Sequence, residues 1–159
     1  MKTNFFRTIL NVIICISILS VFASCSKKDD PEVSPADGRN AKFTFTVTGA
    51  PSSAYISFVA AGVGNDPADA TVWKINGVTQ SSQAAVSLGL NDFTGGTQTY
   101  VVESTKPLRA ISAGAQCLSP AADQPYTISF KAEINGEVKV NEQNIIVSRD
   151  KDFTHNYTF

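Results

Sequence analysis

Few side chains in this chain can carry out covalent or acid–base chemistry. The 159 residues contain one histidine, His155, and three cysteines, of which two lie near the N-terminus and the third is Cys117. A Ser-His-Asp relay needs a histidine held between its two partners. His155 instead shares one face of an expected strand with Phe153 and Tyr157, which indicates a packed or edge position. A zinc or copper site is not expected either, so we predict no enzyme, no metal and no cofactor.

Two groups of acidic residues resemble functional sites. Glu133, Glu137 and Glu142 lie along one expected hairpin, where a carboxylate pair could resemble that of a glycosidase. A charged, solvent-exposed face is the preferred interpretation. The loop from Asn65 to Asp69 offers oxygen ligands for calcium but lacks the ligand number and order of a calcium-binding loop. A plain turn is therefore expected there.

Cys25 is the residue whose neighbours are most informative. The chain starts with the cations Lys2 and Arg7, continues with a mostly apolar run over residues 9–22, and reaches Cys25 through two small residues. The run is shorter than the about 20 apolar residues that a membrane-spanning helix needs. A secretory signal over residues 1–24 fits this pattern.

These residues resemble the signal of bacterial lipoproteins. The resemblance implies that Cys25 receives diacylglycerol on its sulfur, that a peptidase cuts before it, and that its new amine is acylated. Phe22 stands where the usual motif has leucine. The implied partners are the lipoprotein maturation machinery and the lipid of the outer membrane. One acyl chain anchors only marginally, so several would make a lasting tether.

Three charged residues follow the cysteine closely. Lys28, Asp29 and Asp30 are similar to the export signal of Bacteroidota-type surface lipoproteins, a lysine followed by two acidic residues. The resemblance implies recognition by export machinery and a place on the cell surface. The alternative is the periplasmic face of the outer membrane.

The charge of the chain argues against nucleic acid as a partner. Of 13 basic and 14 acidic residues, removal of residues 1–24 takes away only Lys2 and Arg7, so the mature chain is acidic overall. Beyond Lys27 and Lys28 no basic cluster remains to form an electrostatic footprint. With Cys25 acylated, Cys117 has no partner for a disulfide and is expected to be a small buried apolar residue.

The chain after the signal divides into a tether and a domain. Residues 25–40 are rich in Ser, Lys, Asp and Pro and poor in apolar residues, which predicts a flexible tether. Residues 41–159 have the length of one domain with its own core.

The domain shows the period-two pattern of β-strands. Phe43, Phe45 and Val47 alternate with polar residues, so one face should be buried and the other hydrated. Further strands are expected over residues 55–60, 71–75, 84–90, 98–103, 108–112, 126–133, 138–140, 145–148 and 153–159. Turn-forming sequences separate them. We predict an all-β, antiparallel two-sheet β-sandwich, an immunoglobulin-like or transthyretin-like Greek key.

The Asn135-Gly136 sequence allows a prediction of register. A three-residue loop ending at Gly136 would pair Ala132 with Val138 and Phe130 with Val140, placing apolar residues opposite one another. This predicts a β-bulge at Gly136.

Aromatic residues are the remaining candidates for ligand binding, because sugar rings stack on flat apolar faces. Phe93 and Tyr100 flank the Gly95-Gly96 turn, where a ligand could reach them. Trp73 shares a strand face with Ile75, which favours the core. We predict a lipid-anchored, non-enzymatic binding or accessory module at the cell envelope, with a glycan or an envelope protein as candidate ligand.

Alternative functions remain open. Residues 126–159 resemble the strand pattern of fimbrillin-type pilus proteins, which implies a pilus or adhesin subunit processed after Arg39. The ending at Phe159 resembles the closing strand of small outer-membrane barrels, although the expected strands of about 4–8 residues are shorter than the about 9–11 that spanning requires. An envelope enzyme would need a catalytic set that the sequence does not contain.

Overall fold

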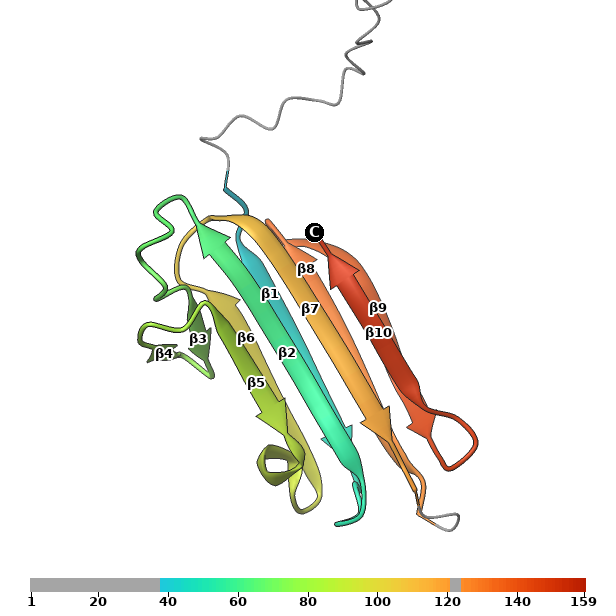
Figure 1. The fold of residues 1–159 in the computed structure, drawn as a ribbon. Helices are drawn as coiled ribbons and strands as arrows, with labels where there is room; N and C mark the ends of the chain where they lie inside the picture. Colours follow the sequence, from blue (N-terminus) through green and yellow to red (C-terminus); the bar gives the residue numbers. More distant parts are fainter. Residues whose placement is uncertain (1–37, 121–123) are drawn as a thin grey trace, which may run out of the picture. The chain divides into compact units, whose positions relative to one another are not determined.

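The computed structural model describes residues 38–120 and 124–159, which form two antiparallel sheets packed against each other (Figure 1). The predicted all-β two-sheet sandwich is confirmed. The predicted signal, Cys25, and the triplet Lys28, Asp29 and Asp30 lie outside the described residues. Within the two described ranges, no helix has the length and apolar content needed to cross a membrane.

The larger sheet contains six strands and the smaller sheet four. In spatial order the larger sheet consists of β4 (Val78–Gln80), β3 (Trp73–Ile75), β6 (Thr97–Ser104), β1 (Ala41–Thr48), β8 (Tyr126–Ile134) and β9 (Glu137–Val147). The smaller sheet consists of β10 (Phe153–Thr158), β7 (Leu108–Leu118), β2 (Tyr55–Gly64) and β5 (Ala85–Gly89). A short 3-10 turn, η1 (Leu90–Phe93), follows β5.

The core is built from inward side chains of both sheets, with large aromatic rings packed against small residues of β7. Phe45 of β1 and Phe130 of β8 stack with their ring centroids 5.1 Å apart, and both are 1% exposed. The inward residues of β7 include Ala113 and Ala115, which leave room for these rings. Phe45 also meets Phe58 of β2 at 4.5 Å, which joins the two sheets. Burying each such ring contributes about 1.5–3 kcal/mol to folding.

The β8–β9 hairpin differs from its predicted register. Ile134 pairs with Glu137, so the loop contains only Asn135 and Gly136, which take φ values of 51° and 79°. Two successive positive φ values are the mark of a two-residue type I′ turn. The predicted three-residue loop and the predicted bulge at Gly136 are wrong.

Of the two register shifts between β8 and β9, the one nearer the turn is a bulge on β9, three residues after the turn. Glu133 pairs with Val138 and Ala132 pairs with Val140, which leaves Lys139 as the extra residue. Val140 thereby packs against the core while Lys139 stays in solvent. The bulge satisfies the apolar pattern that the sequence indicated, at a different residue.

The ordered domain begins earlier than predicted. Residues up to Asn40 were assigned to the flexible tether, but Arg39 pairs with Leu108 through two backbone hydrogen bonds of 2.8 and 2.9 Å. Gly38 lies against Pro107 so closely that an added Cβ would stand 2.6 Å from the proline Cβ. The chain is therefore held at one end of the sandwich from Gly38 onward.

Candidate functional site

Two of the three aromatic residues predicted as ligand contacts are inaccessible. Trp73 and Phe93 are each 0% exposed. The Trp73 Nε1 donates a hydrogen bond to the Ala84 carbonyl at 3.0 Å, and Phe93 meets Phe58 edge-on at 5.5 Å. Tyr100 is half-buried with its ring 5.3 Å from that of Phe93. Sugar stacking on Trp73 or Phe93 is thus ruled out, because both rings belong to the core.

The side chains that could take part in catalysis have structural roles. His155 lies on the edge strand β10 with its ring centroid 4.4 Å from Phe153 and 5.8 Å from Tyr157, the packed edge position predicted for it. Cys117 is fully buried, and burial raises the pKa of its thiol to about 12. A thiol with such a pKa is a poor nucleophile at neutral pH.

Two acidic residues of the β8–β9 hairpin are paired with lysines. Glu133 and Glu137 form ion pairs with Lys131 at 3.2 Å and Lys139 at 2.7 Å. This agrees with the charged exposed face that the sequence favoured over a glycosidase pair.

Burial, followed by the negative charge of Glu142, raises the pKa of the Tyr157 hydroxyl.

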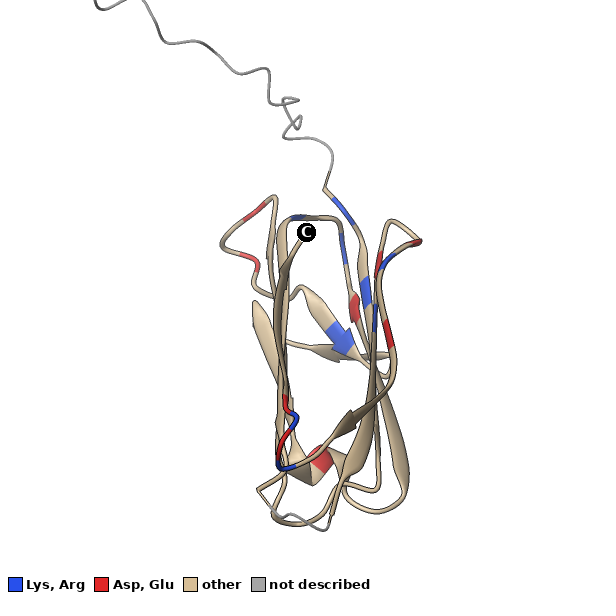
Figure 2. Ribbon diagram, turned by 90° about the vertical axis from the view of Figure 1, so that its right-hand side faces the viewer, with Lys and Arg blue, Asp and Glu red and all other residues tan. Residues whose placement is uncertain are grey.

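The outward side of the four-stranded sheet is an unusual surface because, apart from Arg109 at the β-bulge near the start of β7, it carries no charged side chain. We call it the outer face. It is formed by alternate residues of β2, β5, β7 and β10: Tyr55, Ser57, Val59, Ala61, Val63, Ala85, Ser87, Gly89, Ser112, Gly114, Gln116, Thr154, Asn156 and Thr158. Figure 2 shows lysine, arginine and acidic residues gathering on the other sheet and on the end loops. Arg109, near the start of β7, is the one charged residue within these four strands.

Most polar side chains on the outer face make no hydrogen bond to the described part of the protein. Thr154 bonds to Asp152 at 3.1 Å. The remaining polar residues have no such partner within residues 38–120 and 124–159: Ser57, Ser87, Ser112, Gln116, Asn156 and Thr158. Their donors and acceptors face solvent.

On the outward side of the six-stranded sheet, polar and charged side chains pair with one another instead. Thr46 and Thr99 share a hydrogen bond of 2.9 Å between their hydroxyls. Glu103 lies 3.7 Å from Lys42 and 3.4 Å from Lys74. The two outward sides thus differ both in charge and in how fully their polar groups are satisfied.

The outer face is also hollowed. A depression of about 530 Å³ lies over β2, β7 and β10, with small residues such as Ser112 and Gly114 along β7. A second depression of about 290 Å³ adjoins it and shares Ser112 and Thr158. Partly exposed apolar side chains border or flank the hollow: Val59 is 37% exposed, Val63 45% and Tyr55 50%. Volumes of this size are in the range of ligand-binding clefts.

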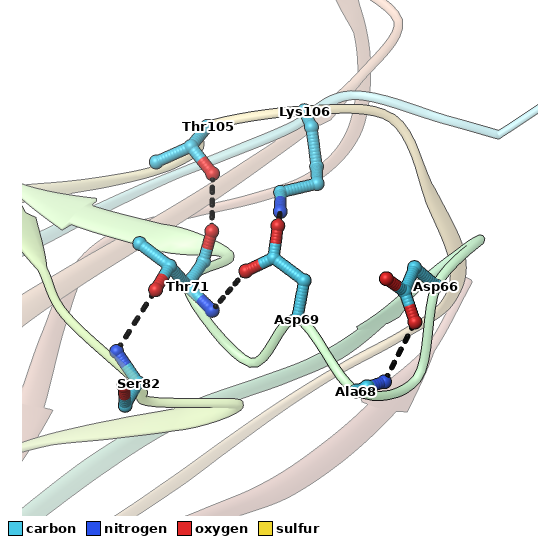
Figure 3. A network of polar contacts seen from close by, with 7 residues as sticks. All are labelled: Asp66, Ala68, Asp69, Thr71, Ser82, Thr105 and Lys106. Atoms are coloured by element: carbon cyan, nitrogen blue, oxygen red, sulfur yellow. Dashed lines mark hydrogen bonds and ion pairs between the residues drawn. The ribbon is translucent and has the colours of Figure 1, made fainter.

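A polar network orders the loop that connects β2 with β3 (Figure 3). Asp66 Oδ1 accepts a hydrogen bond from the Ala68 N–H at 2.9 Å, and Asp69 Oδ1 accepts one from the Thr71 N–H at 3.0 Å. The second oxygen of Asp69 pairs with the Lys106 ammonium, and this bond is the main cause that lowers the pKa of the carboxyl. Residues 65–68 of this loop form the turn that the sequence indicated.

The outer face was not among the predicted site residues, although the sequence contains a signal for it. The runs that became β2 and β7 place Ser, Ala, Gly and Gln at alternate positions and contain only one charge, Arg109. The run that became β8 places Lys131 and Glu133 at such positions. The signal becomes visible only when strands from four separate parts of the chain are set side by side.

Comparisons with known proteins identify the fold but no family. No family model and no curated protein matches the chain. It is similar to a solved structure from Parabacteroides distasonis, described as the calcium-bound form of that protein, with a TM-score of 0.58, 16% identity, and coverage of 81% of this chain and 98% of that one.

Two DUF4425 structures are also similar. The one from Bacteroides vulgatus, a domain of unknown function, has a TM-score of 0.54 at 13% identity, and the one from Bacteroides ovatus has 0.52 at 11%. Each alignment covers 77% of this chain and 94% of the other. At these identities the likeness shows a shared fold alone.

Proposed function

We propose that this chain is a lipid-anchored module of the cell envelope that binds a ligand on the outer face of its four-stranded sheet and performs no catalysis. The anchor in this proposal is Cys25, and Lys28, Asp29 and Asp30 direct export to the cell surface. The sequence pattern around Cys25 supports the anchor. The geometry of the described residues supports the binding surface.

The contrast between the two sheets is the observation that carries the proposal. A solvent-exposed sheet face of a soluble domain ordinarily bears interspersed charges, as the six-stranded sheet does. The outer face bears none, contains a hollow, and leaves most of its polar groups unpaired. On such a surface, a ligand with matching donors and acceptors can exchange hydrogen bonds with the water that it replaces.

The chemistry-bearing side chains support a role without catalysis. His155 lies exposed on an edge strand between the rings of Phe153 and Tyr157, Cys117 is buried, and Glu133 and Glu137 pair with lysines. A general base or nucleophile must instead be positioned and available in a cleft.

Calcium does not fit the loop that the sequence offered for it. Calcium takes six to eight oxygen ligands. Here both carboxylate oxygens of Asp69 already hold donors, the Thr71 N–H and the Lys106 ammonium, and one oxygen of Asp66 holds the Ala68 N–H. We therefore assign calcium no role at this loop. Adding millimolar calcium should leave the thermal midpoint unchanged, whereas an increase that Asp69→Asn abolishes would contradict this.

A pilus subunit processed after Arg39 has less support. The N–H and carbonyl of Arg39 both pair with Leu108, and the Asn40 N–H donates to Asn135 Oδ1 at 2.8 Å. The bond that a protease would cut is thus held inside a backbone ladder. Unchanged surface display and assembly in Arg39→Ala would remove this alternative.

Localisation of variants in cells tests the anchor and the export signal. Cys25→Ala should release the protein in soluble form. The triple change of Lys28, Asp29 and Asp30 to Ala should leave it membrane-bound but shielded from protease added to intact cells. Unchanged protease sensitivity in the triple variant would contradict surface export.

Site-specific crosslinking tests the binding surface. A photocrosslinker attached through Ser112→Cys lies in the hollow, and one attached through Thr46→Cys lies on the opposite sheet as a matched control. On intact cells we expect adducts from position 112 and none from position 46. Equal labelling from both positions would argue against the outer face.

A further inference from the structure

The side chains of the outer face form an ordered grid. Three in-register rows cross the strands in the order β5, β2, β7 and β10: Gly89-Ser57-Gln116-Thr154, Ser87-Val59-Gly114-Asn156, and Ala85-Ala61-Ser112-Thr158. Neighbouring strands lie about 4.8 Å apart and successive rows about 7 Å apart. Hydroxyl and amide groups therefore recur at regular intervals over the surface.

The absence of charge from the grid restricts the chemistry of a ligand. An ionic ligand would lose hydration on entering the hollow and find no counter-charge on the described strands that line it. A ligand with many hydroxyls and no charge could exchange water for Ser57, Gln116 and Asn156, whose side chains have no partner in the described part of the protein. This argues against anionic polymers and phosphate head groups.

We infer that the outer face binds a neutral polysaccharide, with sugar units in the hollow over β2, β7 and β10. The inference rests on the proposed function and names the ligand class of the same surface. Tyr55 pairs with Leu118 next to the first row and is 50% exposed, so it offers an aromatic side chain beside the residues that line the hollow. Val59 offers an apolar contact in the second row.

Two other occupants fit less well. Protein interfaces depend on buried Trp, Tyr and Arg anchors, and Tyr55 is the single side chain of these types on the outer face. A second copy of the chain would bring two hollows together and trap space between them, whereas stable interfaces pack as densely as protein interiors. A flexible chain of hydroxylated rings can follow the hollow.

Affinity electrophoresis tests the inference. The mature chain, residues 25–159 with Cys25→Ser, is run in gels that contain soluble starch, galactomannan or arabinoxylan, with polygalacturonate as the charged counterpart. We expect retardation by at least one neutral polymer and none by polygalacturonate. Retardation by no neutral polymer, or by polygalacturonate alone, overturns the inference.

Paired variants locate the site by titration calorimetry with the retarding polymer. Gln116→Ala combined with Asn156→Ala removes two free amides from the hollow and should raise Kd at least about tenfold, since each lost hydrogen bond is worth about 1 kcal/mol. Thr46→Ala combined with Thr99→Ala makes a matched change on the other sheet and should keep Kd within about twofold. Equal weakening in both pairs would contradict the assignment to the outer face.

Two further results would distinguish a wrong ligand class from a wrong binding surface. If no neutral polymer binds but the crosslinker at position 112 captures a protease-sensitive partner, the surface stands and the ligand is a protein. If light scattering shows a dimer that Ser112→Glu dissociates, the occupant is a second copy. Either result overturns the polysaccharide inference.

Discussion

Asn40 and Asn135 are joined by two hydrogen bonds at the end of the sandwich where β1 begins. The Asn40 N–H donates to Asn135 Oδ1 at 2.8 Å, and the Asn135 N–H donates to the Asn40 carbonyl at 2.8 Å. Asn135 also takes a φ of 51° as the first residue of the β8–β9 turn. Asn135 thus shapes the hairpin and also joins it to the residue that precedes β1.

Substitutions of Asn135 should separate these two roles. Asn135→Ala loses the side-chain acceptor, worth about 1 kcal/mol, and replaces a residue that tolerates left-handed backbone by one that adopts it at a cost of about 1–2 kcal/mol. Asn135→Gly loses only the acceptor and keeps the turn. Urea unfolding of residues 25–159 should show about 2 kcal/mol of destabilisation for Ala and about 1 for Gly. Equal stability of the two variants would mean that the positive φ carries no strain.

The core could be predicted from the sequence because it depends on local alternation. Phe43, Phe45 and Val47 were expected on one face of a strand, and all three are buried. The same logic favoured a buried Trp73, which is 0% exposed. A period of two is a property of a single strand, so it needs no knowledge of the strand's neighbours.

Features that depend on pairing between strands could not be predicted in this way. The β8–β9 hairpin combines a two-residue turn with a bulge at Lys139, and Asn135 in this turn bonds to Asn40, which is far apart from it in sequence. The outer face likewise needs β10, β7, β2 and β5 in their spatial order. The predicted contact Phe93 failed because η1 turns its ring inward onto Phe58.

Cys117 should be unreactive in the native protein. Burial raises the pKa of its thiol to about 12, so almost no thiolate is present at pH 8. In residues 25–159 with Cys25→Ser, a disulfide reagent such as DTNB should release about one equivalent of chromophore only after denaturant is added. Rapid labelling under native conditions would show that the β7 strand opens or that the thiol is exposed. Cys117→Ser is the blank for this assay.

The Lys106–Asp69 ion pair should give a defined pH dependence. The hydrogen bond from Lys106, with that from the Thr71 N–H, lowers the pKa of Asp69 in the folded state. A lowered carboxyl pKa contributes stability that is present above the unfolded value of about 3.9 and is lost as pH falls through the folded value.

Lys106→Met should therefore raise the pKa of Asp69 in an NMR titration of the side-chain carboxyl. It should also lower the thermal midpoint slightly at pH 7, because an exposed pair is weak, and the difference from wild type should shrink as pH falls below about 4. Lys151→Met, which removes a lysine that forms no ion pair with the described residues, is the control. A difference in midpoint that grows on acidification would contradict this account.

Gly62 should be intolerant of even a methyl group, because two core side chains close over it. A Cβ added there would lie 2.6 Å from Leu108 Cδ1 and 2.9 Å from Trp73 Cζ2, and both side chains are fully buried. Overpacking of this kind costs about 1–3 kcal/mol. Gly62→Ala should lower the free energy of unfolding by that amount and change the fluorescence of Trp73, the one tryptophan in the chain. Gly64→Ala is the matched control, since its nearest neighbour, Lys106 Cδ, is 3.5 Å away. If the two variants unfold at the same urea concentration, the Trp73 and Leu108 side chains can move aside, and the tight closure of β2 on the core is not required for stability.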